Sequence, residues 1–304
     1  MRRVAVLGPG GVGGFIAAAL ARAGQDVVVV AREETALALR RDGMTVDSRR
    51  VGEFHVALDA GPSLDTPVDA LIVATKARDL DPALARVTTD PPVVLPLLNG
   101  LDHLAVLRER FGSRAVAGSI RIEAYRTGPS HVVQSSEFLR IDMASADPAM
   151  RPLLEELATL LEGADVPARV MDSEAQAVWG KLVRLNAIAL MTSAYDLPLG
   201  PIRTTPELRD ELMACVREAA CVAAAEGARA EVAETMGELD DAHASLRTSM
   251  QRDIAAGAEP ELDAIAGSVL RAAARHGLEC PMIARLAERV AARAGTPASA
   301  GAPR

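Results

Sequence analysis

Arg3 to Arg32 read RVAVLGPGGVGGFIAAALARAGQDVVVVAR, and this stretch decides the fold. An apolar run, Val4 to Leu7, breaks into a glycine-rich turn, after which Ala and Leu recur at helical spacing as far as Gly24. A second apolar run then occupies Val27 to Ala31. This order predicts a strand, a tight turn, a helix and a second strand, which is the first unit of a parallel sheet covered by helices.

The glycine-rich turn predicts a dinucleotide site. Gly8 permits the tight turn, Gly10 lets the backbone approach a pyrophosphate, and Gly13 lets the helix pack against the strand. The phosphates would lie over the free N–H groups at the helix start. A bare GxGxxG spacing fits an incidental turn as well, but here it joins a strand to a helix, as the mechanism requires. The candidate cofactor-binding residues of the turn are Gly8, Pro9, Gly10, Gly11, Val12 and Gly13.

The end of the second strand indicates which dinucleotide binds. A site for NAD needs Asp or Glu there to bind the ribose 2′-hydroxyl, whereas a site for NADP needs a cation for the 2′-phosphate. This chain offers Arg32, so the sequence favours NADPH. Glu33 and Glu34 follow at once, but they suit equally well the acidic first turn of a helix over Thr35–Arg41. The alternative is that Arg32 is a solvated surface charge.

Composition excludes several classes of protein. The chain has 304 residues, enough for two domains with separate cores, and 49% of them are hydrophobic and 24% charged. A net charge of −8 without a basic cluster argues against nucleic acid and anionic membrane as partners. No apolar run is long enough to span a bilayer and no signal peptide precedes the first strand, so we expect a cytoplasmic protein.

The cysteines point to the same compartment. Cys215, Cys221 and Cys280 have neither CxxC nor metal-ligand spacing, and their number is odd. A reducing cytoplasm, with the thiols as small core residues, is the simplest interpretation, and no metal site is expected.

Residues 1–170 alternate short apolar runs with helical stretches and predict an NADP-binding, Rossmann-type α/β domain with a doubly wound sheet. Its first four runs are continuous, as in parallel strands buried on both faces, whereas the last three are spaced by turn signals and predict an antiparallel meander that closes the sheet. A helix near Pro148–Glu162 and a short strand near Ala168–Val170 complete the domain. The seven runs are Val4–Leu7, Val27–Ala31, Ala70–Ala74, Val93–Leu98, Val116–Ala124, His131–Gln134 and Phe138–Met143.

Residues 171–294 predict an all-helical domain for substrate binding or dimerisation. A long helix from about Ser173 to Ala194 leads into it. Its Ala-rich helices could bury the interface of a homodimer, but the sequence does not decide the oligomeric state. Residues 295–304, rich in Ala, Gly, Pro and Ser, predict a flexible tail. The helical patterns are broken at Pro198–Pro201, Gly227, Gly257–Pro260 and Gly277.

Polar residues follow two of the predicted parallel strands. Lys76 comes after the strand that ends at Ala74, and Asn99 comes directly after the strand that ends at Leu98. Ligands of open parallel sheets bind beyond the carboxyl ends of the strands, so this shared location favours a role in a site. Each residue has a plain alternative, because lysines are usually solvated and Asn-Gly is a common turn.

Lys181 and Glu261 are the ionisable candidates of the helical domain. Lys181 lies in an otherwise apolar helix, on a stripe with Ile188 and Thr192, where desolvation would lower its pKa toward the range useful for proton transfer. Glu261 follows Pro260, which suits the first turn of a helix. The alternative for Glu261 is an acid placed at a helix start for the dipole alone.

Taken in order, these motifs resemble the ketopantoate reductase (2-dehydropantoate 2-reductase) family, two-domain NADPH enzymes of pantothenate synthesis. The resemblance covers the chain to about residue 294. It implies that Lys181 is the general acid, that Glu261 orients the substrate and that Ser249 contacts the substrate carboxylate. It also implies that Lys76 and Asn99 lie between nicotinamide and substrate. The match rests on GPGGVGG with Arg32, Thr75-Lys76, Leu98-Asn99-Gly100, Trp179-Gly180-Lys181-Leu182, Ser249-Met250 with Asp253, and Glu261-Leu262-Asp263 with Gly267 and His276-Gly277.

One departure from the family concerns the substrate. Better-known members carry asparagines four and eight residues after the catalytic lysine and another after the next proline, where an ungapped reading places Leu185, Ala189 and Leu199. Asn186 is no substitute, because five residues along a helix turn it roughly 140° from Lys181. Part of the substrate-binding set has therefore become apolar.

The expected reaction is reduction of ketopantoate, a 2-oxo acid, to (R)-pantoate, with hydride from NADPH and a proton from Lys181. One rival is a reductase of the same scaffold that acts on a different 2-oxo acid or related carbonyl. The other rival is a non-catalytic NADP(H)-binding regulator, which would have no reason to keep Lys181 and Glu261 together.

Overall fold

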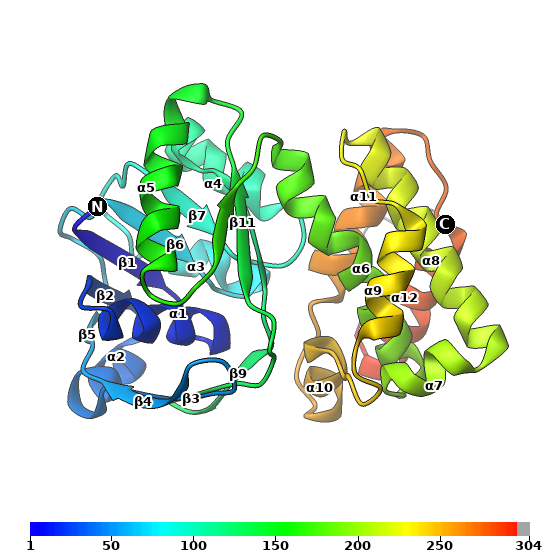
Figure 1. Ribbon diagram of the computed structural model, residues 1–304, viewed down its shortest axis with the longest axis horizontal. Coiled ribbons are helices and arrows are strands. Elements are labelled where there is room, and N and C mark those ends of the chain that lie inside the picture. The colour runs from blue at the N-terminus through cyan, green and yellow to red at the C-terminus, as the bar shows by residue number, and fades with distance from the viewer. Residues whose placement is uncertain (297–304) are drawn as a thin grey trace. The chain divides into compact units, whose positions relative to one another are not determined.

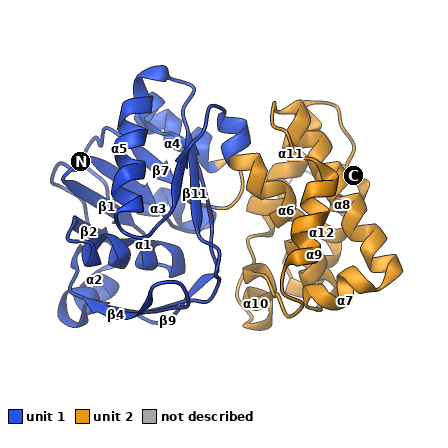
Figure 2. Ribbon diagram, viewed as in Figure 1, with its two compact units in different colours: residues 1–98, 103–177 blue, residues 99–102, 178–304 orange. Residues whose placement is uncertain are grey.

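The structure, a computed structural model, describes residues 1–296 of the chain. Its contacts divide it into two units, coloured separately in Figure 2: residues 1–98 with 103–177, and residues 99–102 with the chain from residue 178 onward. The domain boundary at residue 170 stays a prediction. Apart from Gly295 and Thr296, the predicted flexible tail lies outside the described residues.

The main sheet of the first unit is parallel throughout. Within the described residues it has five strands in the order β5-β2-β1-β6-β7 (Figure 1). The four continuous apolar runs are confirmed as strands of this sheet, and the short edge strand β5 was not predicted. The strands are β1 (Arg3–Leu7), β2 (Asp26–Val30), β5 (Asp59–Gly61), β6 (Ala70–Val73) and β7 (Val94–Pro96).

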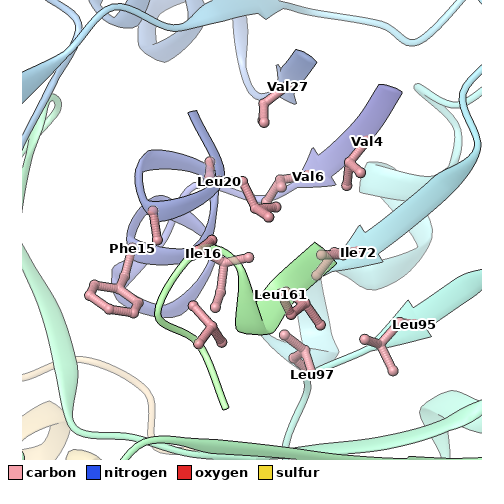
Figure 3. Close-up of a cluster of buried hydrophobic side chains, with 14 of the residues drawn as sticks. Val4, Val6, Phe15, Ile16, Leu20, Val27, Ile72, Leu95, Leu97 and Leu161 are labelled. Atoms are coloured by element: carbon pink, nitrogen blue, oxygen red, sulfur yellow. The ribbon is translucent and has the colours of Figure 1, made fainter. Parts of the chain in front are cut away.

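The runs are continuous because each face of the sheet is covered. Val4 and Val6 of β1 lie on one face in a cluster with Ile16 and Leu20 of helix α1 (Figure 3), whereas Ala5 and Leu7 point into a second cluster on the other face, with side chains of α3 and α4. Burial of each such valine or leucine contributes about 1.5–3 kcal/mol to folding. The doubly wound α/β fold is thereby confirmed. The helices of this unit are α1 (Gly11–Arg22), α2 (Glu33–Asp42), α3 (Leu80–Leu84), α4 (His103–Phe111) and α5 (Arg151–Glu162).

The predicted antiparallel meander is wrong, because its strands belong to two other sheets. One sheet has the order β4-β3-β10-β9 and the other the order β12-β11-β8. The run predicted as Val116–Ala124 breaks after Arg121. Its first part, β8, pairs antiparallel with β11, whereas β9, which starts at Ala124, forms a hairpin with β10 in the other sheet. Turn signals mark where strands end but not which strands pair. The bounds are β3 (Met44–Ser48), β4 (Gly52–Val56), β8 (Ala117–Arg121), β9 (Ala124–Gly128), β10 (His131–Gln134), β11 (Arg140–Ala144) and β12 (Ala168–Val170).

The second unit is helical throughout its described part. Helix α8 is central and contacts α7, α9, α11 and α12. The Glu218 carboxylate of α8 accepts from the backbone N–H groups of Met282 and Ile283, at 2.8 Å each, and so caps the N-terminus of α12. The helices are α6 (Glu174–Tyr195), α7 (Leu199–Thr204), α8 (Pro206–Ala225), α9 (Val232–Asp241), α10 (Ser249–Ala255), α11 (Ser268–Arg275) and α12 (Pro281–Ala294).

The predicted break at Pro198 is confirmed, because α6 ends at Tyr195 and α7 begins at Leu199. The break is shorter than predicted, since Pro201 already lies in the first turn of α7, where a proline removes only an N–H that has no helical partner. The prediction that Pro260 lies in the first turn of a helix is wrong. Pro260 precedes its helix, and Glu261 lies just before the first helical residue, with its carbonyl accepting from Ile265 N–H at 3.0 Å. A π-helical turn, η4 (Asp263–Gly267), follows directly and runs into α11.

Candidate active site

The glycine turn between β1 and α1 has the geometry that a dinucleotide needs. Gly8 has a φ of +90°, and a Cβ on Gly13 would lie 2.2 Å from the Gly8 carbonyl oxygen, so both positions require glycine. A Cβ on Gly10, in contrast, would come no nearer than 4.0 Å to the Ala74 carbonyl oxygen. The backbone at Gly10 therefore faces open space, which a phosphate group can approach closely.

This open space is a cavity of ≈ 470 Å³ within the first unit. It lies at the carboxyl ends of β1, β2 and β6, and its lining includes Gly8, Gly10, Arg32, Lys76 and Arg126. Both the size and the cationic lining fit an anionic nucleotide. The structure thus brings Arg32 and Lys76 to the same cavity as the glycine turn.

At the Arg32 end of the cavity, Asp79 lies between the guanidinium groups of Arg32 and Arg78. Its Oδ1 is 3.4 Å from Nη2 of Arg32, and its Oδ2 is 3.9 Å from Nε of Arg78. The Arg32 side chain is 78% exposed, so this ion pair contributes little to stability. Sequence reasoning missed Asp79, although its place three residues after Lys76 beyond a parallel strand was a usable signal.

Three of the predicted site residues form one hydrogen-bonded network in the second unit. Nζ of Lys181 donates to Oδ1 of Asn99 at 2.7 Å, and Nδ2 of Asn99 donates to Oε2 of Glu261 at 3.1 Å. The ammonium can only donate and the carboxylate can only accept, so the orientation of the Asn99 amide is fixed by its partners. The Asn99 amide therefore bridges the Lys181 ammonium and the Glu261 carboxylate.

The segment that carries Asn99 is fastened at two further points. Gly100 has a φ of +88°, and a Cβ there would lie 2.0 Å from the carbonyl oxygen of Ala264 in η4. Nη2 of Arg271 lies 2.6 Å from Oδ2 of Asp102, while its Nη1 lies 2.8 Å from Oδ1 of Asp263. We call the ion pairs of Arg271 with Asp102 and Asp263 the clamp. Sequence reasoning missed the clamp, because Arg271 and Asp102 are 169 positions apart in the chain.

Ser249 begins α10 and is exposed, with its neighbour Thr248 capping the helix through Oγ1. Among the described residues it has no hydrogen bond to Lys181, Asn99 or Glu261, so its contact with a substrate carboxylate stays a prediction.

The positions where the family carries asparagine are apolar in this chain and largely buried. Ala189 and Leu199 are fully buried, whereas Leu185 is partly exposed. Asn186 is also fully buried, and its Nδ2 donates to the Cys215 sulfur on α8 at 3.7 Å. Its side chain points toward the helical core, and that it does not replace the absent asparagines stays a prediction.

Two of the three cysteines are core residues, as predicted. Burial raises the pKa of the Cys280 thiol to about 12 and that of Cys215 well above its usual range. The prediction is wrong for Cys221, which is exposed, because six residues along α8 turn it roughly 120° away from Cys215. No cluster of metal-ligating side chains occurs within residues 1–296, and none of the helices described there has the length and apolarity to cross a bilayer.

Comparison with known proteins identifies the family. The family model described as ketopantoate reductase PanE/ApbA matches residues 4–147, and the model of the C-terminal part of the same family matches residues 174–294. The chain belongs to the ketopantoate reductase family. The resemblance stated from the motifs is thereby confirmed, and the chain is an oxidoreductase of the ketopantoate reductase type.

Individual relatives agree with the family, and the fold is shared with a dehydrogenase of another name. A 2-dehydropantoate 2-reductase of Mycobacterium tuberculosis is 33% identical over 291 residues, 92% of this chain and 93% of the relative. The crystal structure of a 2-dehydropantoate 2-reductase from Geobacter metallireducens is 25% identical, with a TM-score of 0.88 over 95% of this chain and 98% of that chain. D-mandelate dehydrogenase, solved with NADH and anilino(oxo)acetate, is 20% identical with a TM-score of 0.88 over 96% of this chain and 98% of its own. At that identity the last likeness shows the fold alone.

Proposed function

We propose that this chain reduces 2-dehydropantoate to (R)-pantoate with NADPH, the reductive step toward pantothenate. The observation that carries the proposal is the hydrogen-bonded network of Lys181, Asn99 and Glu261, in a chain that also has a glycine turn fit for a dinucleotide. Family membership supports the reaction class. A regulator that only binds NADP(H) would need the turn but not the network.

Lys181 is the general acid of the proposed reaction. NADPH held by the glycine turn would supply a hydride to the carbonyl carbon of the oxo acid. As the carbon–oxygen π bond breaks, the Lys181 ammonium donates a proton to the developing alkoxide, and the neutral amine later regains a proton from water. One of its three N–H groups is held by Asn99 at 2.7 Å, so the others are directed rather than freely rotating.

Glu261 and Ser249 are proposed to orient the substrate. The Oε2 atom of Glu261 is occupied by the Asn99 amide, which leaves the other carboxylate oxygen to accept from the substrate hydroxyl. The Ser249 hydroxyl at the start of α10 would donate to the substrate carboxylate. In this scheme residues 1–170 bind the cofactor, through the glycine turn, Arg32 and Lys76, and residues 171–294 bind the oxo acid.

A second candidate, reduction of a different 2-oxo acid, is favoured by the apolar replacements. Ala189 and Leu199 are fully buried and cannot hydrogen-bond a substrate hydroxyl through their side chains. A site that hydrogen-bonds a hydroxyl strongly rejects an analogue that lacks it, whereas an apolar wall discriminates weakly. The D-mandelate dehydrogenase with a similar fold was solved with anilino(oxo)acetate, so this scaffold accommodates a bulky oxo acid in that protein.

The test measures the loss of NADPH absorbance with a panel of 2-oxo acids that includes 2-dehydropantoate and its deoxy analogue 3,3-dimethyl-2-oxobutanoate. A preference in kcat/KM for 2-dehydropantoate above roughly 10³ supports the first function with Glu261 reading the hydroxyl. Values within about tenfold of each other, a gap of about 1.4 kcal/mol, support the relaxed pocket. Binding of NADPH without turnover of any oxo acid contradicts both.

A further inference from the structure

A strand of the four-stranded sheet lies directly against the glycine turn. A Cβ on Gly11, the first residue of α1, would lie 2.4 Å from the carbonyl oxygen of Ala124 and 2.7 Å from Cα of Tyr125. Both of these residues belong to β9. Only glycine at position 11 allows this approach, so the sequence of the turn has a second purpose, which is to admit β9.

Arg126, the next residue of β9, is brought to the turn by this packing. Its Nη1 donates to the carbonyl oxygen of Pro9 at 3.0 Å, and its Nε donates to the carbonyl oxygen of Gly128 at 3.1 Å. The two bonds use two of the five N–H donors of the guanidinium. The side chain also lines the cavity that contains Gly10.

The charge of Arg126 is available to a ligand. Within residues 1–296 its interactions are with backbone carbonyls, and no carboxylate pairs with it. The residue is exposed overall, but its guanidinium is partly desolvated against the turn, which lowers its pKa below the ordinary value. A guanidinium remains charged at any physiological pH even so.

We propose that Arg126 binds the diphosphate of the dinucleotide, opposite the backbone N–H groups of the glycine turn. The proposal rests on the cofactor part of the proposed function. Arg126 is held at Pro9, beside the position where the backbone opens onto the cavity, whereas Arg32 stands at the end of β2 and pairs with Asp79. The two arginines therefore recognise different phosphates, Arg126 the diphosphate and Arg32 the 2′-phosphate.

Fragments of the cofactor separate these two roles. ADP carries a diphosphate and no 2′-phosphate, whereas adenosine 2′-monophosphate carries the reverse. Arg126→Gln should raise the Kd of ADP and of NADPH about tenfold, the lower end for a charge-assisted hydrogen bond because the residue is exposed, and leave the Kd of adenosine 2′-monophosphate unchanged. Arg32→Gln should weaken adenosine 2′-monophosphate and NADPH and spare ADP.

The matched control is Arg49→Gln, which removes an exposed guanidinium next to β3 of the same sheet, where it pairs with Glu137. It should leave all three Kd values unchanged, which excludes a general effect of net charge. The melting temperature of the nucleotide-free Arg126→Gln variant should stay close to that of the wild type, because the bond to Gly128 is exposed and the bond to Pro9 is only partly buried. A lowered melting temperature with equal losses for both fragments would show instead that Arg126 only supports the turn.

Two other results would also overturn the proposal. One is an unchanged Kd of ADP in Arg126→Gln, and the other is an unchanged dependence of ADP binding on salt, since loss of a direct cation–phosphate contact must make binding less salt-sensitive. Neither ADP nor adenosine 2′-monophosphate contains an oxo acid or a nicotinamide. Failure of the chain to reduce 2-dehydropantoate therefore leaves this test intact.

Discussion

The glycine turn and the Lys181 network place their groups by opposite means. In the turn, contiguous residues from Gly8 to Gly13 shape a backbone, and what matters is the absence of side chains. In the network, side chains come from α6, from the segment after β7 and from the second residue before η4, with 162 positions between Asn99 and Glu261. Specificity thus comes from space at one site and from polar partners at the other.

The two sites should therefore tolerate different changes. A backbone site should fail when an atom is added, and a side-chain network should fail when a partner is removed. Substitutions of the two kinds test this contrast.

Removal of the network's cation should have the largest effect. Lys181→Ala should lower kcat by about 10² to 10⁴, the usual contribution of a general acid, with little change in the Kd of NADPH. Lys181→Gln should lose as much, because an amide can hydrogen-bond Asn99 but cannot protonate an alkoxide. Steady-state kinetics and NADPH titration of both variants make the measurement, and a variant that retains most of its kcat would remove Lys181 from the mechanism.

Addition of one methyl group to the turn should come next. A Cβ on Gly13 would lie 2.2 Å from a backbone oxygen that cannot move without the turn, so Gly13→Ala should lower the free energy of unfolding by about 3 kcal/mol, the upper range for overpacking, and abolish NADPH binding. The control is Gly163→Ala, where φ is −62° and the nearest atom would be 3.4 Å away. Urea unfolding measures both, and equal stabilities would show that the turn has slack.

The sequence predicted the glycine turn fully, but it predicted the side-chain contacts around the two sites only in part. The turn was predicted residue by residue, because strand, turn and helix are adjacent and their patterns are local. Arg126 and the Arg271–Asp102 clamp were not predicted, since nothing local distinguishes them from surface charges. The strand β3 was also missed. It forms a hairpin with the adjacent strand β4, and its other partner, β10, lies far along the chain, as the bond between Ser48 and Gln134 across 86 positions shows.

Arg32, at the end of β2, is a side chain that is proposed to bind the same cofactor as the glycine turn. Arg32→Ala should weaken NADPH by about 1.5–3 kcal/mol, the range for a charge-assisted hydrogen bond, and leave NADH almost unchanged. Fluorescence titration with each cofactor gives the two Kd values. Equal losses for both cofactors would indicate that Arg32 supports structure rather than a 2′-phosphate.

The clamp on the Asn99 segment should have a smaller effect than the network itself. Arg271→Met removes the ion pairs with Asp102 and Asp263, so Asn99 should lose part of its positioning and kcat should fall about tenfold, with the Kd of NADPH unchanged. Asp263→Asn removes one ion pair but keeps the pair with Asp102, and it should retain most of the activity. If both variants lose the same activity, the ion pair between Arg271 and Asp102 is not what positions the segment that carries Asn99.

Substitution of Asp79 should have the smallest effect, and it should strengthen NADPH binding, whereas the other substitutions lower binding, activity or stability. Its carboxylate lies 3.4 Å from the guanidinium of Arg32, where it would compete with the proposed 2′-phosphate of NADPH and repel it. The pair is exposed, so its removal is worth about 0.2–1 kcal/mol, and Asp79→Asn should lower the Kd of NADPH by about 1.4- to fivefold. NADH should bind no better or slightly worse, because an acid near this position can accept from the ribose 2′-hydroxyl. Glu33→Gln, which removes an exposed acid from the first turn of α2, is the control for net charge alone. Weaker NADPH binding in Asp79→Asn would mean that the carboxylate positions Arg32 for the phosphate instead of competing with it.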